Sequence, residues 1–215
     1  MTELEGIKQK VISMSGKTMH MWQLAYDAFI EHDEDLIAEA LEDENQINAL
    51  LDEVSHSIIN IGKAPISAQD KLNITIYADM AADFEMIGDY CKDILERVQI
   101  KINERLLFSE DAVEEYKELY NKTKASLEEV VFSLERDNPG LIKEVLKKEE
   151  HIDELVDKYR GQHNERLVAG KCTPMGCNLF LNMLDFTAAI YYHTKKIAKS
   201  ILKIKQGGFE KRSWI

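Results

Sequence analysis

Hydrophobic residues recur at helical spacing over most of the chain, and residues 67–106 show the pattern most clearly. On a helical wheel with about 100° per residue, the apolar positions of this segment gather on one face. The carboxylates Glu85, Asp89 and Asp93 lie on the opposite face. The pattern predicts a long amphipathic helix with a core face and a polar face. The apolar positions are Tyr77, Met80, Phe84, Ile87, Cys91, Ile94, Leu95 and Val98.

Five further segments have the same character, and strand signals are weak. The β-branched run at residues 73–76 is short and continues directly into a helical pattern. Short connections between helices favour antiparallel neighbours. We therefore predict an all-α fold of six antiparallel helices, at residues 4–31, 34–61, 67–106, 109–134, 139–168 and 174–205.

Residue types that favour helix starts occur near the beginnings of the predicted helices. Pro65, Pro139 and Pro174 precede or open predicted helices, a position in which the missing N–H of proline costs nothing. Ser67 and Ser109 are predicted N-caps, because each is followed within three residues by acidic side chains that suit the first turn.

The two halves of the chain are related by an internal repeat. Residues 39–54 align without gaps with residues 144–159, an offset of 144 − 39 = 105. Residues 83–95 likewise align with residues 186–198, an offset of 186 − 83 = 103. The repeat predicts two tandem three-helix bundles, with the first repeat at residues 1–107, the second at 108–206 and a C-terminal tail at 207–215.

The charge of the chain limits its partners. With 27 Lys and Arg against 39 Asp and Glu, the formal net charge is −12, which argues against nucleic acid as a partner. No apolar run approaches the roughly 18–20 residues of a membrane-spanning helix, and the first residues lack the apolar core of a signal peptide. We therefore expect a cytoplasmic chain that does not itself insert into a membrane.

The three cysteines, Cys91, Cys172 and Cys177, show no CxxC spacing and form an odd set. Neither a disulfide framework nor a zinc site is suggested by this spacing. We expect all three to be reduced thiols.

Three carboxylates follow one another at i, i+4 spacing within residues 83–94, namely Glu85, Asp89 and Asp93. Like charges at this spacing repel by roughly 0.2–0.5 kcal/mol per pair. A bound cation would relieve the repulsion, and hydration of a solvent-exposed face is the alternative explanation.

The same segment, DFEMIGDYCKDI, resembles the hallmark of the PhoU-like domains, which is close to (D/E)-x-E-R-I-G-D-x-A-x-N-I. The second repeat adds residues 166–172 and six further positions. The sequence at these positions is most similar to that of the cytoplasmic C-terminal PhoU-like domain of bacterial sodium/phosphate cotransporters. These positions are Glu149, Ile152, Asp153, Leu155, Tyr159 and His163.

The resemblance implies two tandem three-helix bundles and a role in phosphate transport or phosphate homeostasis. It also implies a surface site for one divalent cation, Mg²⁺, Mn²⁺, Ca²⁺ or iron, because PhoU proteins hold metal clusters with E/DxxxD motifs on neighbouring helices. The residues it designates are Glu85, Asp89, Asp93, Glu44 and Asn48. Asn48 departs from the family pattern, which has a carboxylate there. In the second repeat, Ala188 and Tyr192 replace Glu85 and Asp89, so no second cluster is expected.

The last predicted helix carries a basic strip where its counterpart in the first repeat is acidic. Lys195, Lys196 and Lys199 correspond to Lys92, Asp93 and Glu96, and Lys203 continues the line. In an acidic protein such a strip is a plausible docking surface for an acidic partner, a phosphate group or the acidic face of a second copy. Simple solvation is the alternative.

No glycine-rich phosphate loop or nucleophile motif is present, and we do not expect an enzyme. We expect a regulatory domain that docks on a membrane transporter or its sensor protein, with a homodimer as a further expectation. Both an excised domain of a cotransporter and a free-standing protein fit the sequence. The alternative function is a carboxylate-rich metal-binding protein with a storage or hydrolytic role. In the tail, Phe209 and Trp214 are expected to fold back onto the bundles.

Overall fold

The computed structural model describes residues 2–63, 65–140, 142, 146 and 151–205. In these ranges the chain forms long helices and no strand, which confirms the predicted all-α fold. The predicted boundaries agree within three residues for five of the six helices. The helices are α1 (Glu3–Glu31), α2 (Glu34–Ile61), α3 (Ala68–Asn103), α4 (Glu110–Glu135), α6 (Ile152–Val168) and α7 (Pro174–Lys205).

The fifth predicted helix, at residues 139–168, is wrong as a continuous element. His151 has φ −75° and ψ 60°, and α6 begins after it at Ile152. This ψ lies far from the helical value of about −42°, so the helical hydrogen-bond ladder cannot pass through His151. Glu149, at the start of the predicted motif at residues 149–153, lies outside the described residues, as do Phe209 and Trp214 of the tail.

The predicted N-caps are confirmed. The Ser67 hydroxyl accepts a hydrogen bond from the backbone N–H of Asp70 at 3.0 Å, and the Ser109 hydroxyl accepts one from Ala112 at 3.3 Å. Each bond satisfies one of the four backbone donors that a helix start leaves without an internal partner. The two caps fix where α3 and α4 begin.

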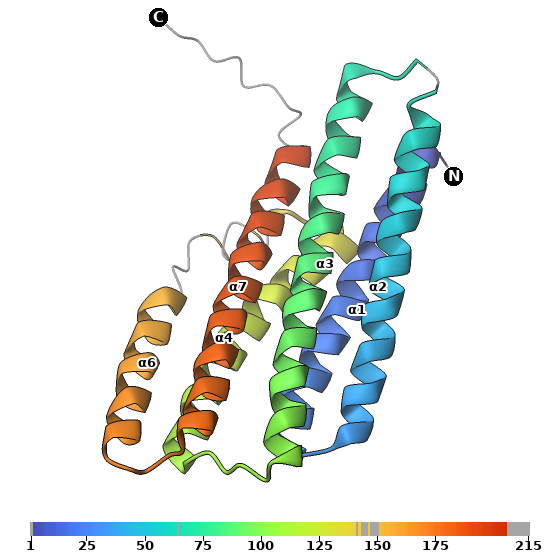
Figure 1. Ribbon diagram of the computed structural model, residues 1–215. Helices are drawn as coiled ribbons and strands as arrows, with labels where there is room; N and C mark the ends of the chain where they lie inside the picture. Colours follow the sequence, from blue (N-terminus) through green and yellow to red (C-terminus); the bar gives the residue numbers. More distant parts are fainter. Residues whose placement is uncertain (1, 64, 141, 143–145, 147–150, 206–215) are drawn as a thin grey trace, which may run out of the picture.

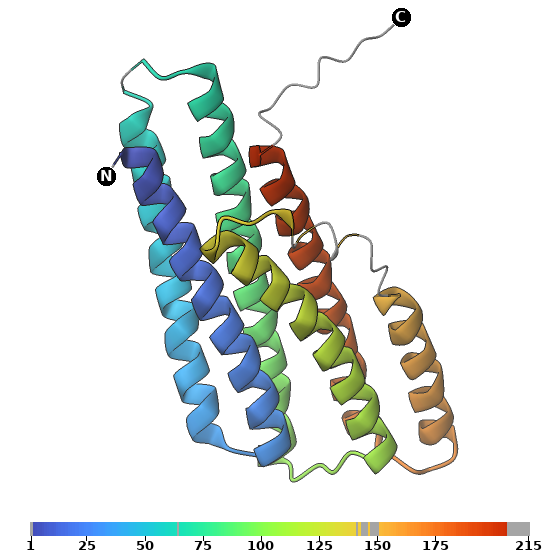
Figure 2. The same ribbon diagram turned by 180° about the vertical axis from the view of Figure 1, so that it is seen from behind.

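Within the described ranges the helices fall into two groups, as Figures 1 and 2 show. Helices α1, α2 and α3 pack against one another, and α7 packs against α4 and α6. The groups meet where α3 lies alongside α7 and α1 lies alongside α4. Helix α6 is the outermost element of the second group and contacts only α4 and α7 among the described helices.

Aromatic side chains fill the contact between α1 and α4. The rings of Tyr26 and Tyr120 stack with centroids 3.8 Å apart, and Phe29 meets Tyr116 edge to face at 5.0 Å. Such pairs contribute about 0.5–1.5 kcal/mol each beyond the burial of their area. The first and second groups therefore share one continuous apolar core.

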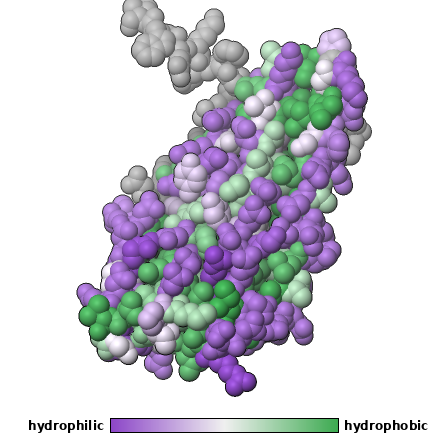
Figure 3. Space-filling model, in the orientation of Figure 1, coloured by the Kyte–Doolittle hydropathy of each residue, from purple (hydrophilic) through white to green (hydrophobic). Residues whose placement is uncertain are grey.

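The face of the molecule in Figure 3 carries hydrophilic residues over most of its area, and its apolar residues form small separate patches. In the described part of the chain, no helix combines the length and the hydrophobicity that crossing a bilayer requires.

Candidate functional site

The predicted acidic face lies on α3, where Glu85, Asp89 and Asp93 are all partly buried. Burial raises the pKa of Glu85, and the neighbouring Asp89 raises it further through its charge and a side-chain hydrogen bond. Glu44 of α2 contributes to the same shift. The structure therefore brings Glu85, Asp89 and Glu44 within electrostatic range of one another, as the family pattern implies.

Glu44 is buried, and its neighbours provide a positive charge and a hydrogen-bond donor. Lys92 Nζ lies 3.1 Å from Glu44 Oε1, and Asn48 Nδ2 donates a hydrogen bond to the same oxygen at 2.9 Å. Asn48 thus faces Glu44 with its amide nitrogen, which cannot be a metal ligand. The ammonium group of Lys92 therefore occupies the position beside Glu44 in which a metal ion would lie.

Asp93, the remaining predicted ligand, lies near a basic residue of its own helix. Asp93 lies 3.8 Å from Arg97 Nη1, one helical turn along α3. Within the described ranges, these carboxylates do not bring three oxygen atoms within 4.8 Å of one another. As arranged here, the set does not fit a divalent cation with a full protein ligand shell. An ion held mainly by Glu85 and Asp89 remains a prediction.

The predicted basic strip on α7 divides into two parts. Lys196 Nζ lies 2.5 Å from Asp83 Oδ1 and forms an ion pair inside the molecule, and Lys195 lies over the Tyr191 ring at 5.4 Å. Lys199 and Lys203 are exposed and line a hollow of about 360 Å³ between α3 and α7. Lys196 is exposed as well and lines the same hollow, but its charge is paired with Asp83. The attraction of an acidic partner would therefore fall to Lys199 and Lys203.

Sequence reasoning missed Asp83, which joins the two groups of helices. Its side chain is only 5% exposed, and Oδ1 lies 2.8 Å from His193 Nδ1 on α7 as well as near Lys196. One signal could have revealed it. Asp83 falls on the apolar face of the wheel beside Met80 and Ile87, and an acid in such a position is almost never buried without a partner.

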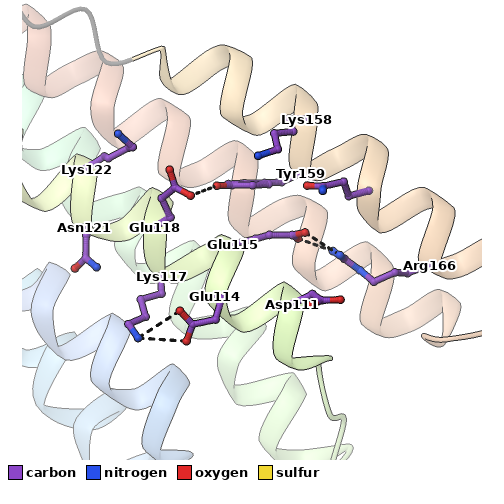
Figure 4. Close-up of a pocket in the computed structure, with 11 residues that line it drawn as sticks. Asp111, Glu114, Glu115, Lys117, Glu118, Asn121, Lys122, Lys158, Tyr159 and Arg166 are labelled. Carbon is purple, nitrogen blue, oxygen red and sulfur yellow. Dashed lines mark hydrogen bonds and ion pairs between the residues drawn. The ribbon is translucent and has the colours of Figure 1, made fainter.

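A hollow with a volume of about 720 Å³ lies between α4 and α6 (Figure 4). Arg166 Nη1 lies 2.8 Å from Glu115 Oε1, and the Tyr159 hydroxyl donates to Glu118 at 2.6 Å. Four acidic and four basic side chains line the hollow. Because the charges balance and pair locally, the hollow shows no convergent site for an anion or a cation. The acidic residues are Asp111, Glu114, Glu115 and Glu118, and the basic ones are Lys117, Lys122, Lys158 and Arg166.

The architecture defines an all-α protein of two three-helix groups joined through α3 and α7, with an acidic face on α3. Residues 11–98 match the protein family described as PhoU domain. This span covers α2 entirely, most of α1 and α3, and the acidic face.

Solved structures share the whole fold. The crystal structure of PhoU from Pseudomonas aeruginosa has a TM-score of 0.86 at 18% identity, over 95% of this chain and 98% of that one. The phosphate transport system regulatory protein PhoU from Streptococcus pneumoniae has a TM-score of 0.78 at 13% identity, over 95% and 96% of the two chains. Among curated proteins, none matches the sequence. The chain therefore has the PhoU fold, and its first half matches the PhoU domain.

Proposed function

We propose that this chain is a non-catalytic regulatory protein of phosphate transport that acts by docking on a membrane transporter or its sensor protein. The match of residues 11–98 to the PhoU domain is the observation that carries the proposal. The shared fold supports it, since one of the similar structures is described as a phosphate transport system regulatory protein. A cytoplasmic location follows from this role, both for a free-standing protein and for a domain of a sodium/phosphate cotransporter.

The exposed lysines of α7 are the proposed docking surface. Lys199 and Lys203 face solvent beside the hollow between α3 and α7. In a chain with net charge −12, a local basic face is the part of the surface that attracts an acidic partner. Lys196 is excluded from this surface because it is paired with Asp83.

A divalent cation at Glu85 and Asp89 is a second, separable part of the proposal. Burial and then repulsion from Asp89 and Glu44 raise the pKa of Glu85, and a bound ion would relieve the repulsion. The alternative of a storage or hydrolytic metalloprotein gains no support here, because Lys92 and Asn48 already engage Glu44.

The docking surface can be tested in cells that normally make the protein. Cells lacking the chain are complemented with the wild type or with the Lys199→Glu, Lys203→Glu double variant, and phosphate uptake is measured in high and low external phosphate. The double variant is expected to fail to restore regulation while folding normally by circular dichroism.

A matched control is Lys71→Glu with Lys171→Glu, which makes the same charge change at exposed positions away from the hollow. This control is expected to restore regulation fully. Uptake that is unaffected by loss of the chain would contradict the proposed function, and equal behaviour of the two double variants would contradict the docking surface.

A further inference from the structure

The end of α6 and the start of α7 bring together three metal-ligand side chains that the sequence does not group. A ring nitrogen of His163 and the sulfur atoms of Cys172 and Cys177 all lie within 4.8 Å of one another. His163 and Cys177 are buried, whereas Cys172 is partly exposed. The spacing of the cysteines suggested no zinc site, because the three ligands come from different parts of the fold. His163 lies on α6, Cys172 in the turn that follows α6, and Cys177 on α7.

The backbone of the connection holds these residues in place. Gly170 adopts φ +69° after the end of α6, and the N–H of Lys171 donates to the Arg166 carbonyl at 2.9 Å. The Thr173 hydroxyl then accepts from the N–H of Gly176 at 3.1 Å, which caps the start of α7. Cys177 follows in the first turn of α7. These bonds set the ligand positions without any contribution from a metal.

His163 has a nitrogen atom without a partner. Its Nδ1 lies 3.0 Å from Arg166 Nη2, and since a guanidinium only donates, Nδ1 accepts. Its Nε2 is buried and has no hydrogen-bond partner, although the residue is only 1% exposed. The ring is held in place by stacking on Phe180 at 4.3 Å. In this tautomer Nε2 carries the proton and is a buried donor without an acceptor, which costs about 1–3 kcal/mol.

We propose that His163, Cys172 and Cys177 bind one borderline transition-metal ion of the Zn²⁺ class, with a water molecule as fourth ligand. Thiolate and imidazole ligands select such ions over Mg²⁺ or Ca²⁺. Zn–S and Zn–N bonds of about 2.3 and 2.0 Å place ligand atoms of a tetrahedral site roughly 3.5–3.8 Å apart. The observed separations, within 4.8 Å, need to shorten by about 1.3 Å at most.

Binding exchanges protons for the metal. Each thiol gives up one proton as its sulfur binds the ion, because the thiolate is the metal ligand. The imidazole proton moves from Nε2 to Nδ1, which ends the bond from Arg166, while Arg166 keeps its ion pair with Glu115. Two protons are released in total, and the affinity is expected to rise with pH.

The test uses the full chain, reduced and freed of metal. Co²⁺ is added first, because sulfur-to-cobalt charge transfer gives an absorption band that reports thiolate ligation, and Zn²⁺ is then added to displace it, as the affinity order requires. One equivalent of Co²⁺ is expected to saturate the band. Cys172→Ser and Cys177→Ser are each expected to lose the band and to weaken Zn²⁺ binding by more than about 100-fold, the upper end of the loss caused by outer-shell changes.

The matched control is Cys91→Ala, which removes the remaining thiol from the core of the first group and leaves the site intact. Its band is expected to be unchanged. His163→Gln tests the imidazole, with circular dichroism to confirm folding, and an unchanged Zn²⁺ affinity in this variant would overturn the three-ligand site.

Two other results would also overturn the proposal. Metal binding that survives both cysteine substitutions would place the ion elsewhere. A chain that binds neither ion while reduced, and that forms a Cys172–Cys177 disulfide when treated with glutathione disulfide, would show a redox-active thiol pair in place of a metal site. Mass spectrometry under non-reducing conditions distinguishes this last case.

Discussion

Asp83 Oδ1 of α3 lies 2.8 Å from His193 Nδ1 of α7, and this buried contact ties the first group of helices to the second. Asp83→Ala leaves the His193 ring without its partner and Lys196 without its ion pair. Loss of a partner from a buried polar contact costs about 1–3 kcal/mol. Urea unfolding is expected to show a loss of stability in this range.

Asp79→Ala is the control for this prediction, because Asp79 is an exposed carboxylate one turn earlier on α3. Substitutions at such surface positions usually change stability by less than about 0.5 kcal/mol. Equal stability of the two variants would show that the Asp83 contact does not hold the groups together.

Lys92 and Glu44 give a second prediction, about the acidic face. Lys92→Met removes the ammonium group 3.1 Å from the buried Glu44 carboxylate and is expected to cost about 1–3 kcal/mol. Adding Glu44→Gln removes the uncompensated charge, so the double variant is expected to recover part of the loss in urea unfolding. A double variant less stable than Lys92→Met would mean that Glu44 does not depend on Lys92.

Glu85 gives a third prediction, which tests the proposed cation. Glu85→Gln removes repulsion from Asp89 and is expected to raise stability by a few tenths of a kcal/mol, roughly the value for like charges at i, i+4. If an ion binds Glu85 and Asp89, millimolar Mg²⁺ or Mn²⁺ raises the melting temperature of the wild type more than that of the variant. Equal shifts in both proteins, measured by thermal unfolding, would remove the cation from the proposed function.

Lys101 gives a prediction about pH. It is buried, donates to His32 Nε2 and lies over the Phe29 ring at 5.1 Å. Burial lowers its pKa from 10.5 to about 8. Between pH 8 and 10.5 the unfolded chain therefore binds more protons than the folded one, so the free energy of unfolding contributed by Lys101 rises with pH, by up to about 3 kcal/mol.

Lys101→Met is expected to remove this rise and to be as stable as the wild type or more stable at neutral pH, because no buried charge remains. His32 is exposed and can bond to water after the substitution. The exposed Lys71→Met is the control and is expected to keep the wild-type pH profile of urea unfolding. A steeper rise above pH 8 in Lys101→Met would contradict the assignment.

The sequence could predict the helices because their causes are local. Apolar spacing marks the buried face of α3, and Ser67 and Ser109 cap the first turns of α3 and α4 through neighbours three residues away. The break at His151 was missed because the residues around it form a good helical pattern, and a single ψ angle interrupts it.

The candidate sites could be predicted only in part. Glu85 and Asp89 are neighbours on one helix, so their proximity follows from the sequence. Other decisive partners come from another helix. Lys92 approaches Glu44 from α3, and Asp83 meets Lys196 across the two groups, which takes that lysine out of the predicted docking strip.

The sequence by itself determined five of the predicted helices and the acidic face, since each depends on residues within a few turns of one another. Only the tertiary structure decided which charges are neutralised and which ligands meet. His163, Cys172 and Cys177 show this most directly, because a turn between α6 and α7 brings together side chains whose spacing along the chain predicts no site. Packing between helices sets these pairings. The periodicity of one helix shows which of its faces is buried, but it does not show which residues of other helices contact that face.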